Sequence, residues 1–387
     1  MAGYTGPMYT DTVSALITPD VEKKLILANS ELATLTVFLK LTKGGNIAVK
    51  NPTHTYFEDD NLGRWATIDA QGAAVGATNF SVGNSDGWKL PAGTVLRVPR
   101  TGETILITAI SGDVVSTATR SWGNTAATEL LPAEPLQIIG NAQLEGYTVG
   151  DGGQSSPIQK TARCQIFSHP FSVTGTMDAT EIYDDKGSFD GKKLKAMLQH
   201  YSDQDIAALY GEVASSGSCA TTRRTTTSLN ETITTNSTDF GGLAMSEVQF
   251  QNAVRPIFEL GSARKILVAS SYVADTISNY STMKFQSSLG QTAYGNSIRS
   301  YIFGSGELTI IVARKSLSGA NNRNFFIVDA ENAKRMYLSG NGQNRDTKLT
   351  IFGKENSGVD SRKGEYMCEA GFYFPQEESH MRGINVG

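Results

Sequence analysis

The stretch that most constrains the fold of this chain is residues 161–212, where a strand-like segment leads directly into the longest amphipathic helix of the sequence. From residue 163 to 176, apolar side chains are spaced among polar ones as in a strand with one buried face. Its main apolar residues are Ile166, Phe171 and Val173. Almost none of these side chains is chemically reactive, so the stretch indicates a structural element rather than a catalytic site.

The predicted helix opens at Asp190 and Gly191 and runs over about residues 192–212. Its apolar face is formed by Leu194, Leu198, Tyr201 and Leu209. Polar side chains point elsewhere, namely Lys193, Gln199, Asp203 and Glu212. We interpret the apolar face as core, because nothing in its pattern is typical of a cofactor-binding motif.

Composition bounds the class of protein. A chain of 387 residues has material for two or three structural units, and 39 % hydrophobic residues suffice for a buried core. The 34 basic residues are outnumbered by 38 acidic ones, so the chain shows no global attraction to nucleic acid.

Cysteine usage and the N-terminal sequence indicate the compartment. Cys164, Cys219 and Cys368 are too few and too far apart for a metal knot or a disulfide framework, which suits a reducing environment. The first 20 residues hold no Lys or Arg and no continuous apolar core, so we expect no signal peptide. No stretch approaches the roughly 18–20 apolar residues of a membrane span. We therefore expect a protein that is made in cytoplasm and does not enter a membrane.

Glycines punctuate residues 83–140 and separate apolar runs such as TVLRV and TILITAI. Such spacing is typical of β-hairpins joined by tight turns. Because these strands come before the main core, we expect them to project from it or to form a small β-lobe of their own.

The other segments predict an arm, a connector and a further helix. Residues 1–16 are small and polar and predict a flexible arm, after which Thr18, Pro19 and Asp20 fit a helix start. The stretch 221–238 contains nine threonines, is neither helical nor apolar, and is expected to join two domains.

Ser246 and Gln249 fit a capping box that starts another helix, which should end at Gly261 and be bent or interrupted by Pro256. Its buried face would hold Phe250, Val254, Ile257 and Phe258. The closing strand-like runs, KLTIFGK and EYMCEAGFYF, would pair back onto the unit that contains the long helix.

Two glycine-rich motifs suggest chemistry, and each has a simpler structural interpretation. Residues 83–87 fit the nucleophile-elbow pattern G-x-S-x-G around Ser85, but that pattern needs a helix after the serine, and Pro91 and Gly93 prevent one. The run GSFDGKK at 187–193 is one residue short of a phosphate-binding loop and lacks the Ser or Thr that would hold magnesium. We interpret the first as a turn and the second as a helix cap.

Histidines, carboxylates and arginines offer weaker candidates. His54 with Glu58, Asp59 and Asp60 lacks the spacing and the glycine of a calcium loop, so we interpret it as a solvated acidic turn. Structural roles are expected for the isolated histidines, His169, His200 and His380. The basic pair Arg223 and Arg224 is expected to be exposed, with contact to a neighbouring subunit or a phosphate as the alternative.

The order of the segments resembles the major capsid protein of tailed bacteriophages, the Hong Kong phage-type capsid fold that encapsulins share. The long helix resembles that family's spine helix. Residues 93–123 resemble the strands of its extended loop and 141–146 the return of that loop. Residues 221–236 resemble the segment that leaves the spine helix, 264–280 a strand-then-helix step, and 306–338 the closing strands of the apical domain.

The resemblance implies an α+β fold with five parts. They are an N-terminal arm at 1–52, an extended β-loop region at 53–160, a peripheral domain with the spine helix and connector at 161–240, an apical domain at 241–345, and C-terminal strands at 346–387 that return to the peripheral domain.

The resemblance also implies a function without catalysis, cofactor or metal. The subunit would self-assemble into hexamers and pentamers of an icosahedral head that encloses double-stranded DNA without reading its sequence. Portal, scaffolding or decoration proteins would be its other partners. Assembly would take place in the bacterial host cytoplasm, and the product would be the virion capsid.

Two alternatives stay open. An encapsulin-type nanocompartment shell shares the fold but encloses an enzyme cargo, and the extended loop here looks longer than an encapsulin's. A β-rich hydrolase or carbohydrate-binding module would use Trp65, Trp88 and Trp122. Such modules gather their aromatic residues on one face, whereas these three are expected in separate glycine-rich turns.

Overall fold

The structure is a computed structural model of the 387-residue chain. It describes residues 34–42, 44–59, 63–146, 157–181, 187–217, 222–280, 285–286, 292–293, 296–297, 299–352 and 360–387. The expected arm at 1–16, the expected helix start at Thr18–Asp20, Asp60 and Cys219 all lie outside these residues.

The chain divides into two compact units. One is formed by residues 1–55 and 161–387, and the other by residues 56–160. Among the described helices, none is long and apolar enough to cross a membrane.

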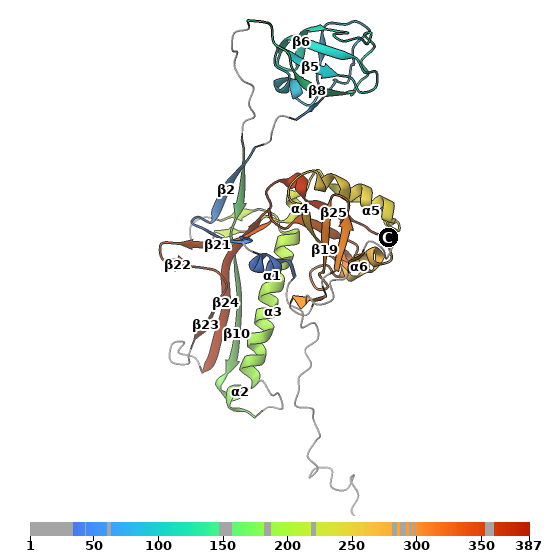
Figure 1. Cartoon of the computed structure of the whole chain (residues 1–387). Helices are drawn as coiled ribbons and strands as arrows, with labels where there is room; N and C mark the ends of the chain where they lie inside the picture. Colours follow the sequence, from blue (N-terminus) through green and yellow to red (C-terminus); the bar gives the residue numbers. More distant parts are fainter. Residues whose placement is uncertain are drawn as a thin grey trace, which may run out of the picture. The chain divides into compact units, whose positions relative to one another are not determined.

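The unit of residues 56–160 is built around a six-stranded sheet with the order β3-β8-β5-β6-β7-β4 (Figure 1). Its strands are β3 (Trp65–Thr67), β4 (Phe80–Ser81), β5 (Thr94–Arg97), β6 (Thr104–Ser111), β7 (Val114–Thr119) and β8 (Pro135–Asn141), with a 3-10 turn η2 at Asp86–Lys89. Alternating residues of these strands, such as Leu96, Ile105, Ile107 and Leu136, are fully buried in a core of their own. The expected lobe of 83–140 is therefore too short, because β3 pairs with β8 and β4 pairs with β7.

The chain enters and leaves this unit through a two-stranded ladder of β2 (Thr53–Glu58) and β9 (Ile158–Arg163). The ladder is closed at its base by a hydrogen bond from the Cys164 amide to the Pro52 carbonyl, 2.8 Å long.

In the other unit, a six-stranded sheet with the path β1-β21-β24-β10 supports the long helix α3 (Gly187–Tyr210) (Figure 1). Its strands are β1 (Asn46–Val49), β10 (Gln165–Thr174), β21 (Lys334–Gly340), β22 (Gln343–Asn344), β23 (Lys348–Phe352) and β24 (Ser361–Tyr373). Two short helices flank it, α1 (Thr34–Leu41) and α2 (Gly175–Ala179). The expectation that the closing strands return to the unit of the long helix is confirmed for β23 and β24, since β24 pairs with both β10 and β23.

The predicted strand and helix are present, with corrections to both. In β10 the buried residues are Phe167, Phe171 and Val173, whereas Ile166 is exposed because it lies on the opposite face. Helix α3 begins at Gly187 rather than at Asp190, and it ends at Tyr210, so Glu212 lies beyond it. Leu198 and Leu209 are buried as predicted, but Leu194 and Tyr201 are only half-buried.

A seven-stranded mixed sheet forms the rest of this unit, with the order β13-β25-β20-β14-β19-β18-β15. Its strands are β13 (Ser237–Asp239), β14 (Arg264–Ala269), β15 (Phe285–Gln286), β18 (Arg299–Phe303), β19 (Gly306–Val312), β20 (Phe325–Asp329) and β25 (Met381–Ile384). Smaller elements are β11 (Ser215–Ser216), β12 (Arg223–Arg224), β16 (Thr292–Ala293), β17 (Asn296–Ser297), and the 3-10 turns η6 (Gly319–Asn321) and η7 (Glu377–Ser379). The last strand, β25, joins this sheet and not the sheet of α3.

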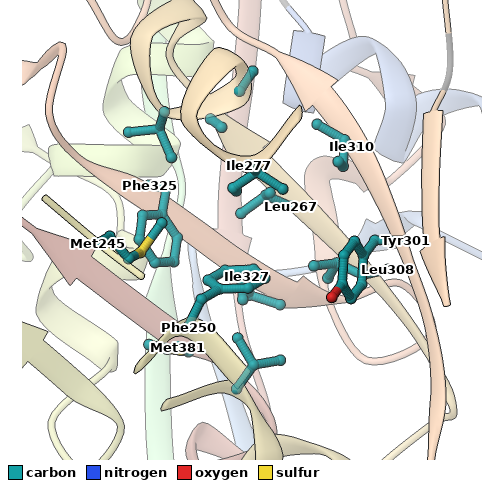
Figure 2. Packing of buried hydrophobic residues seen from close by; sticks show 14 of the residues in the cluster. Met245, Phe250, Leu267, Ile277, Tyr301, Leu308, Ile310, Phe325, Ile327 and Met381 are labelled. Carbon is teal, nitrogen blue, oxygen red and sulfur yellow. The ribbon is translucent and has the colours of Figure 1, made fainter. Parts of the chain in front are cut away.

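This sheet is covered on both faces, which explains why its central strands are apolar throughout. On one face, Leu267, Phe325 and Ile327 pack with Phe250 of α5 (Glu247–Val254) and Ile277 of α6 (Ser271–Ser278), as Figure 2 shows. The opposite face packs against residues of α1, α3 and α4 (Leu229–Thr232), including Leu35, Leu39, Ala208, Leu209 and Leu229.

The helix predicted after residue 245 is present, but it ends before Gly261 and Phe258 is only half-buried. Ser246 caps α5, and the reciprocal contact with Gln249 completes the capping box. The α-helix ends at Val254, and Pro256 lies in the 3-10 turn η4 (Arg255–Phe258) that follows. Gly261 has a φ of +74°, which only glycine adopts without strain.

The Thr-rich stretch was predicted wrongly as neither helical nor apolar. It contains the helix α4, which Ser228 caps with its side chain. Leu229 and Ile233 are fully buried, and so are Thr226 and Ser228. The Thr226 hydroxyl accepts a hydrogen bond from the Phe372 amide, so the polar residues here satisfy the backbone of the core.

Candidate functional sites

The G-x-S-x-G motif forms a tight turn in the β-unit. Ser85 has a φ of 56° and precedes a single 3-10 turn rather than the α-helix that a nucleophile elbow requires. The amide of Gly87 donates to the Asp113 carboxylate over 3.0 Å, and a Cβ on Gly87 would lie 2.0 Å from the Gly112 carbonyl oxygen. The glycine is needed because the turn packs directly against the β6–β7 hairpin.

The run at 187–193 forms the first turns of α3 instead of a phosphate-binding loop. Phe189 is buried against Phe171 of β10, with ring centroids 5.2 Å apart. Arg362 of the neighbouring strand β24 places its guanidinium 3.9 Å from the centre of the Phe189 ring. These contacts fix the helix to the sheet.

The interpretation of His54 and Glu58 as part of a solvated turn is wrong, because both are half-buried residues of strand β2. The His54 ring lies 5.1 Å from the Tyr373 ring, and Glu58 forms an ion pair with Lys160 at 2.6 Å. Over the described ranges, no group of three or more His, Cys, Asp or Glu side chains is arranged to hold a metal ion.

Two histidines that are far apart in sequence meet where α3 packs on β10. His169 Nδ1 lies 3.2 Å from His200 Nδ1, and His169 Nε2 lies 2.7 Å from the Asp203 carboxylate. Because a carboxylate only accepts, His169 Nε2 carries a proton. Burial is the main cause that lowers the pKa of His200 to about 4, and the neighbouring His169 and Lys40 contribute to this shift. His200 is therefore neutral at pH 7.

His380 is fully buried in the other sheet, beside a buried ion pair. Its Nδ1 accepts from the Asp329 amide over 3.0 Å, and its Nε2 donates to the Pro375 carbonyl over 3.2 Å. Burial lowers the pKa of His380 to about 4. Asp329 pairs with Lys265 at 2.8 Å; burial raises the pKa of this carboxyl, but its hydrogen bonds to Lys265 and Ser262 outweigh burial and lower it.

A buried carboxylate that the sequence analysis did not identify connects α1 to α3 by hydrogen bonds. Asp205 is fully buried and accepts hydrogen bonds from the amides of Leu35 and Thr36, at 2.8 and 3.0 Å. It thereby satisfies the first amides of α1, and its other oxygen accepts from Ser316. Asp205 lies on helix α3, for which the sequence analysis predicted that only apolar residues are part of the core.

Arg223 and Arg224 line a hollow of about 350 Å³ with Cys164, Gln165 and Ile166. Arg224 lies 3.8 Å from the Glu369 carboxylate, which also pairs with Arg345 at 2.7 Å. Arg223 is exposed as predicted, while Arg224 is half-buried.

The three tryptophans are exposed and all belong to the unit of residues 56–160. Trp65 lies in strand β3 and Trp88 in the turn η2, so the expectation of glycine-rich turns is wrong for Trp65. The indole of Trp88 has Lys89 over it, 5.8 Å from the ring centre.

The strand β2 of the β2–β9 ladder has two different faces. Thr53, Thr55 and Phe57 of β2 are exposed, whereas His54, Tyr56 and Glu58 between them are half-buried. Among the described residues, one face of β2 is therefore partly covered and the other is exposed. Such a surface suits contact with another molecule better than catalysis.

A family model described as the SU10 major capsid protein matches residues 7–387 of the chain. No curated protein matches it. Among solved structures, the capsid of a native GTA particle matches with a TM-score of 0.51 at 10 % identity, over 99 % of this chain and 100 % of that one. The capsid of an empty GTA particle matches with a TM-score of 0.50 at 8 % identity, over the same shares. The SrpI encapsulin of Synechococcus elongatus PCC 7942 matches with a TM-score of 0.42 at 8 % identity, over 60 % of this chain and 78 % of that one.

Proposed function

The chain belongs to the SU10 major capsid protein family, and from this membership we propose that its copies assemble into the closed shell of a tailed-phage head. It is a structural head protein and not an enzyme, because the family is one of capsid proteins. The predicted α+β capsid fold is confirmed by the likeness to the native GTA capsid, which extends over 99 % of the chain. The family match over residues 7–387 is the observation that carries the proposal.

Within the shell we propose hexamers and pentamers on an icosahedral lattice. The proposed parts are those expected from the sequence: an arm at 1–52, an extended loop region at 53–160, a peripheral domain at 161–240, an apical domain at 241–345 and C-terminal strands at 346–387. The packing of helix α3 on β10 and β24 is evidence for the proposed peripheral domain. The pairing of β2 with β9 is evidence for the proposed extended loop. An extended loop that lies over the next subunit turns weak contacts into a cooperative lattice.

We propose that the shell encloses double-stranded DNA without reading its sequence. The excess of 38 acidic over 34 basic residues supports containment rather than tight binding. Portal, scaffolding and decoration proteins are the further proposed partners, with assembly in the host cytoplasm and the mature protein in the virion.

Electron microscopy and light scattering of the purified chain, over a range of protein and salt concentrations, test the proposal. Rings, capsomers or closed shells are expected. A species that stays monomeric under all conditions contradicts it. The alternative, a nanocompartment shell, is separated by the contents of particles made in cells, because a head holds DNA and a nanocompartment holds a protein cargo.

A further inference from the structure

Two histidines hold helix α3 against strand β10 through a contact that has room for a single proton. His169 Nε2 donates to the Asp203 carboxylate, and the Nδ1 atoms of His169 and His200 lie 3.2 Å apart. A hydrogen bond between two ring nitrogens needs one N–H and one lone pair. The two Nδ1 atoms therefore share one proton, and the contact is lost when each of them carries its own.

The other nitrogen of His200 makes this contact sensitive to acid. His200 Nε2 is buried and has no hydrogen-bond partner among the residues that the structure describes. When both rings are neutral, His200 donates from Nδ1 to His169. A first added proton keeps the shared proton in place but puts an N–H at the buried, unpartnered Nε2, which is costly. A second added proton makes two N–H groups of two cations face each other across 3.2 Å.

The groups around the pair balance one positive charge but not two. The ionisable side chains that face it are Lys40 of α1, Tyr201 and Asp203 of α3, Arg335 of β21, Asp346 between β22 and β23, and Tyr366 of β24. Asp203 balances a charge on His169. Asp346 already pairs with Lys40 and Arg335, at 3.4 and 2.9 Å. Burial, a charge on His169 and these two cations lower the pKa of His200 to about 4, so its protonation favours a state in which the contact is open.

The histidine contact lies between two parts of α3 that are anchored differently. Toward its N-terminus, α3 packs on the sheet through a small cluster that includes Phe171 and Phe189. Beyond His200, Asp205 accepts hydrogen bonds from the first amides of α1, and Leu209 belongs to the larger cluster on the seven-stranded sheet. Loss of the histidine contact therefore weakens the first part of the helix more than the second.

We propose that the His169–His200 contact is an acid-sensitive switch, which releases residues 187–200 of α3 from β10 when both rings are protonated and leaves residues 204–210 in place. Repulsion between the two rings opens the small cluster around Phe171 and Phe189 to water, while Asp205 keeps the end of the helix attached to α1. Return to neutral pH removes the added protons and closes the contact. The switch goes beyond the proposed function, because it belongs to the single subunit and does not require assembly.

Hydrogen exchange of the full, unassembled chain at pH 7 and pH 5 tests the switch, with mass spectrometry as the readout and correction for the intrinsic exchange rate at each pH. In the wild type, the protection of residues 187–200 should fall about tenfold or more on acidification. In His200→Asn, whose amide can donate to His169 Nδ1 without titrating, it should change by less than about twofold. His200→Phe, which fills the same space without a ring nitrogen, gives the same measurement if the asparagine variant does not fold.

The matched control is His380→Asn, which removes an equally buried histidine of the other sheet. Because His380 lies outside the released contact, residues 187–200 should keep the wild-type response in this variant. A smaller response there overturns the switch, since these amides then exchange through unfolding of the whole unit. Equal protection of the wild type at the two pH values, or a wild-type fall in the His200 variants, also overturns it.

Discussion

At the scale of single residues, burial fixes the protonation of two histidines. His200 and His380 are fully buried, and burial lowers the pKa of each to about 4 from an ordinary value of 6.5. Between these two pH values the unfolded chain binds more protons than the folded one, so stability rises with pH. The contribution is fully present above pH 6.5 and is lost as the pH falls through this interval to about 4.

We expect His380→Asn to weaken this acid sensitivity, because its amide oxygen can accept from the Asp329 amide without titrating. Urea unfolding of the unassembled subunit at pH 7 and pH 4.5 measures the effect. The loss of unfolding free energy on acidification should be smaller in the variant by on the order of 2–3 kcal/mol. His54→Asn serves as the control, since it leaves both buried histidines in place; an equal acid response in all three proteins would contradict the assignment.

The turn around Ser85 allows a test of whether Gly87 is required for packing. Gly87→Ala should destabilise the β-unit by about 2 kcal/mol or more, because its Cβ would lie 2.0 Å from the Gly112 carbonyl oxygen. Ser85→Ala should change the unfolding temperature little, since its hydroxyl makes no cap hydrogen bond. Thermal unfolding followed by circular dichroism measures both. A large effect of Ser85→Ala with a neutral Gly87→Ala would refute the packing explanation.

The contacts of a side chain could be predicted where its partners are close to it in sequence. The Ser246 capping box needs only two residues three positions apart, and both contacts form. The pairing of His169 with His200 was not predictable, because it depends on how α3 lies on β10. The same holds for Asp205, whose partners Leu35 and Thr36 are about 170 positions away.

At the scale of elements, the spacing of apolar residues predicted correctly whether a segment is a helix or a strand. It predicted less well which side chains of that segment are buried. Helix α3 was predicted by its apolar residues, but polar side chains fill much of its buried face, including Ser202, Gln204 and Asp205. Ile166 was misplaced because alternation alone cannot say which face of an apolar strand points inward. The Thr-rich stretch was wrongly predicted to be outside the core because its residues are polar. Thr226 is nevertheless buried, and its hydroxyl accepts a hydrogen bond from the Phe372 amide.

The face of α3 can be tested at two adjacent positions. Leu198 is buried and Gln199 is exposed. Leu198→Asp should cost about 4 kcal/mol or more, or make the protein insoluble, because it places an unpaired charge in the interior. Gln199→Asp adds the same charge on the solvent side and should stay within about 0.5 kcal/mol of the wild type. Urea unfolding of soluble protein measures both, and similar damage at the two positions would show that the buried face is assigned wrongly.

At the scale of the whole molecule, glycine spacing predicted a β-lobe but not its limits. The first strand of this sheet, β3, joins it by pairing with β8, where Trp65 lies opposite Gln137. These two residues are over 70 positions apart, and local turn signals do not predict pairing between strands so distant in sequence. The unit of residues 56–160 has its own core around residues such as Leu96, Ile107 and Leu136. Its folding should therefore be separable from that of the remainder.

Replacing residues 63–146 by a short Gly-Ser linker, which keeps β2 and β9, should leave the other unit folded. That unit retains both clusters that cover its seven-stranded sheet, one around Phe250 and Phe325 and the other around Leu209 and Phe326. The shortened chain should unfold at the temperature of the corresponding transition of the wild type, and the excised segment 63–146 should show a cooperative transition of its own by circular dichroism. If the shortened chain is unfolded, or the segment melts without cooperativity, the two units share a core and the division at residues 56 and 160 is wrong.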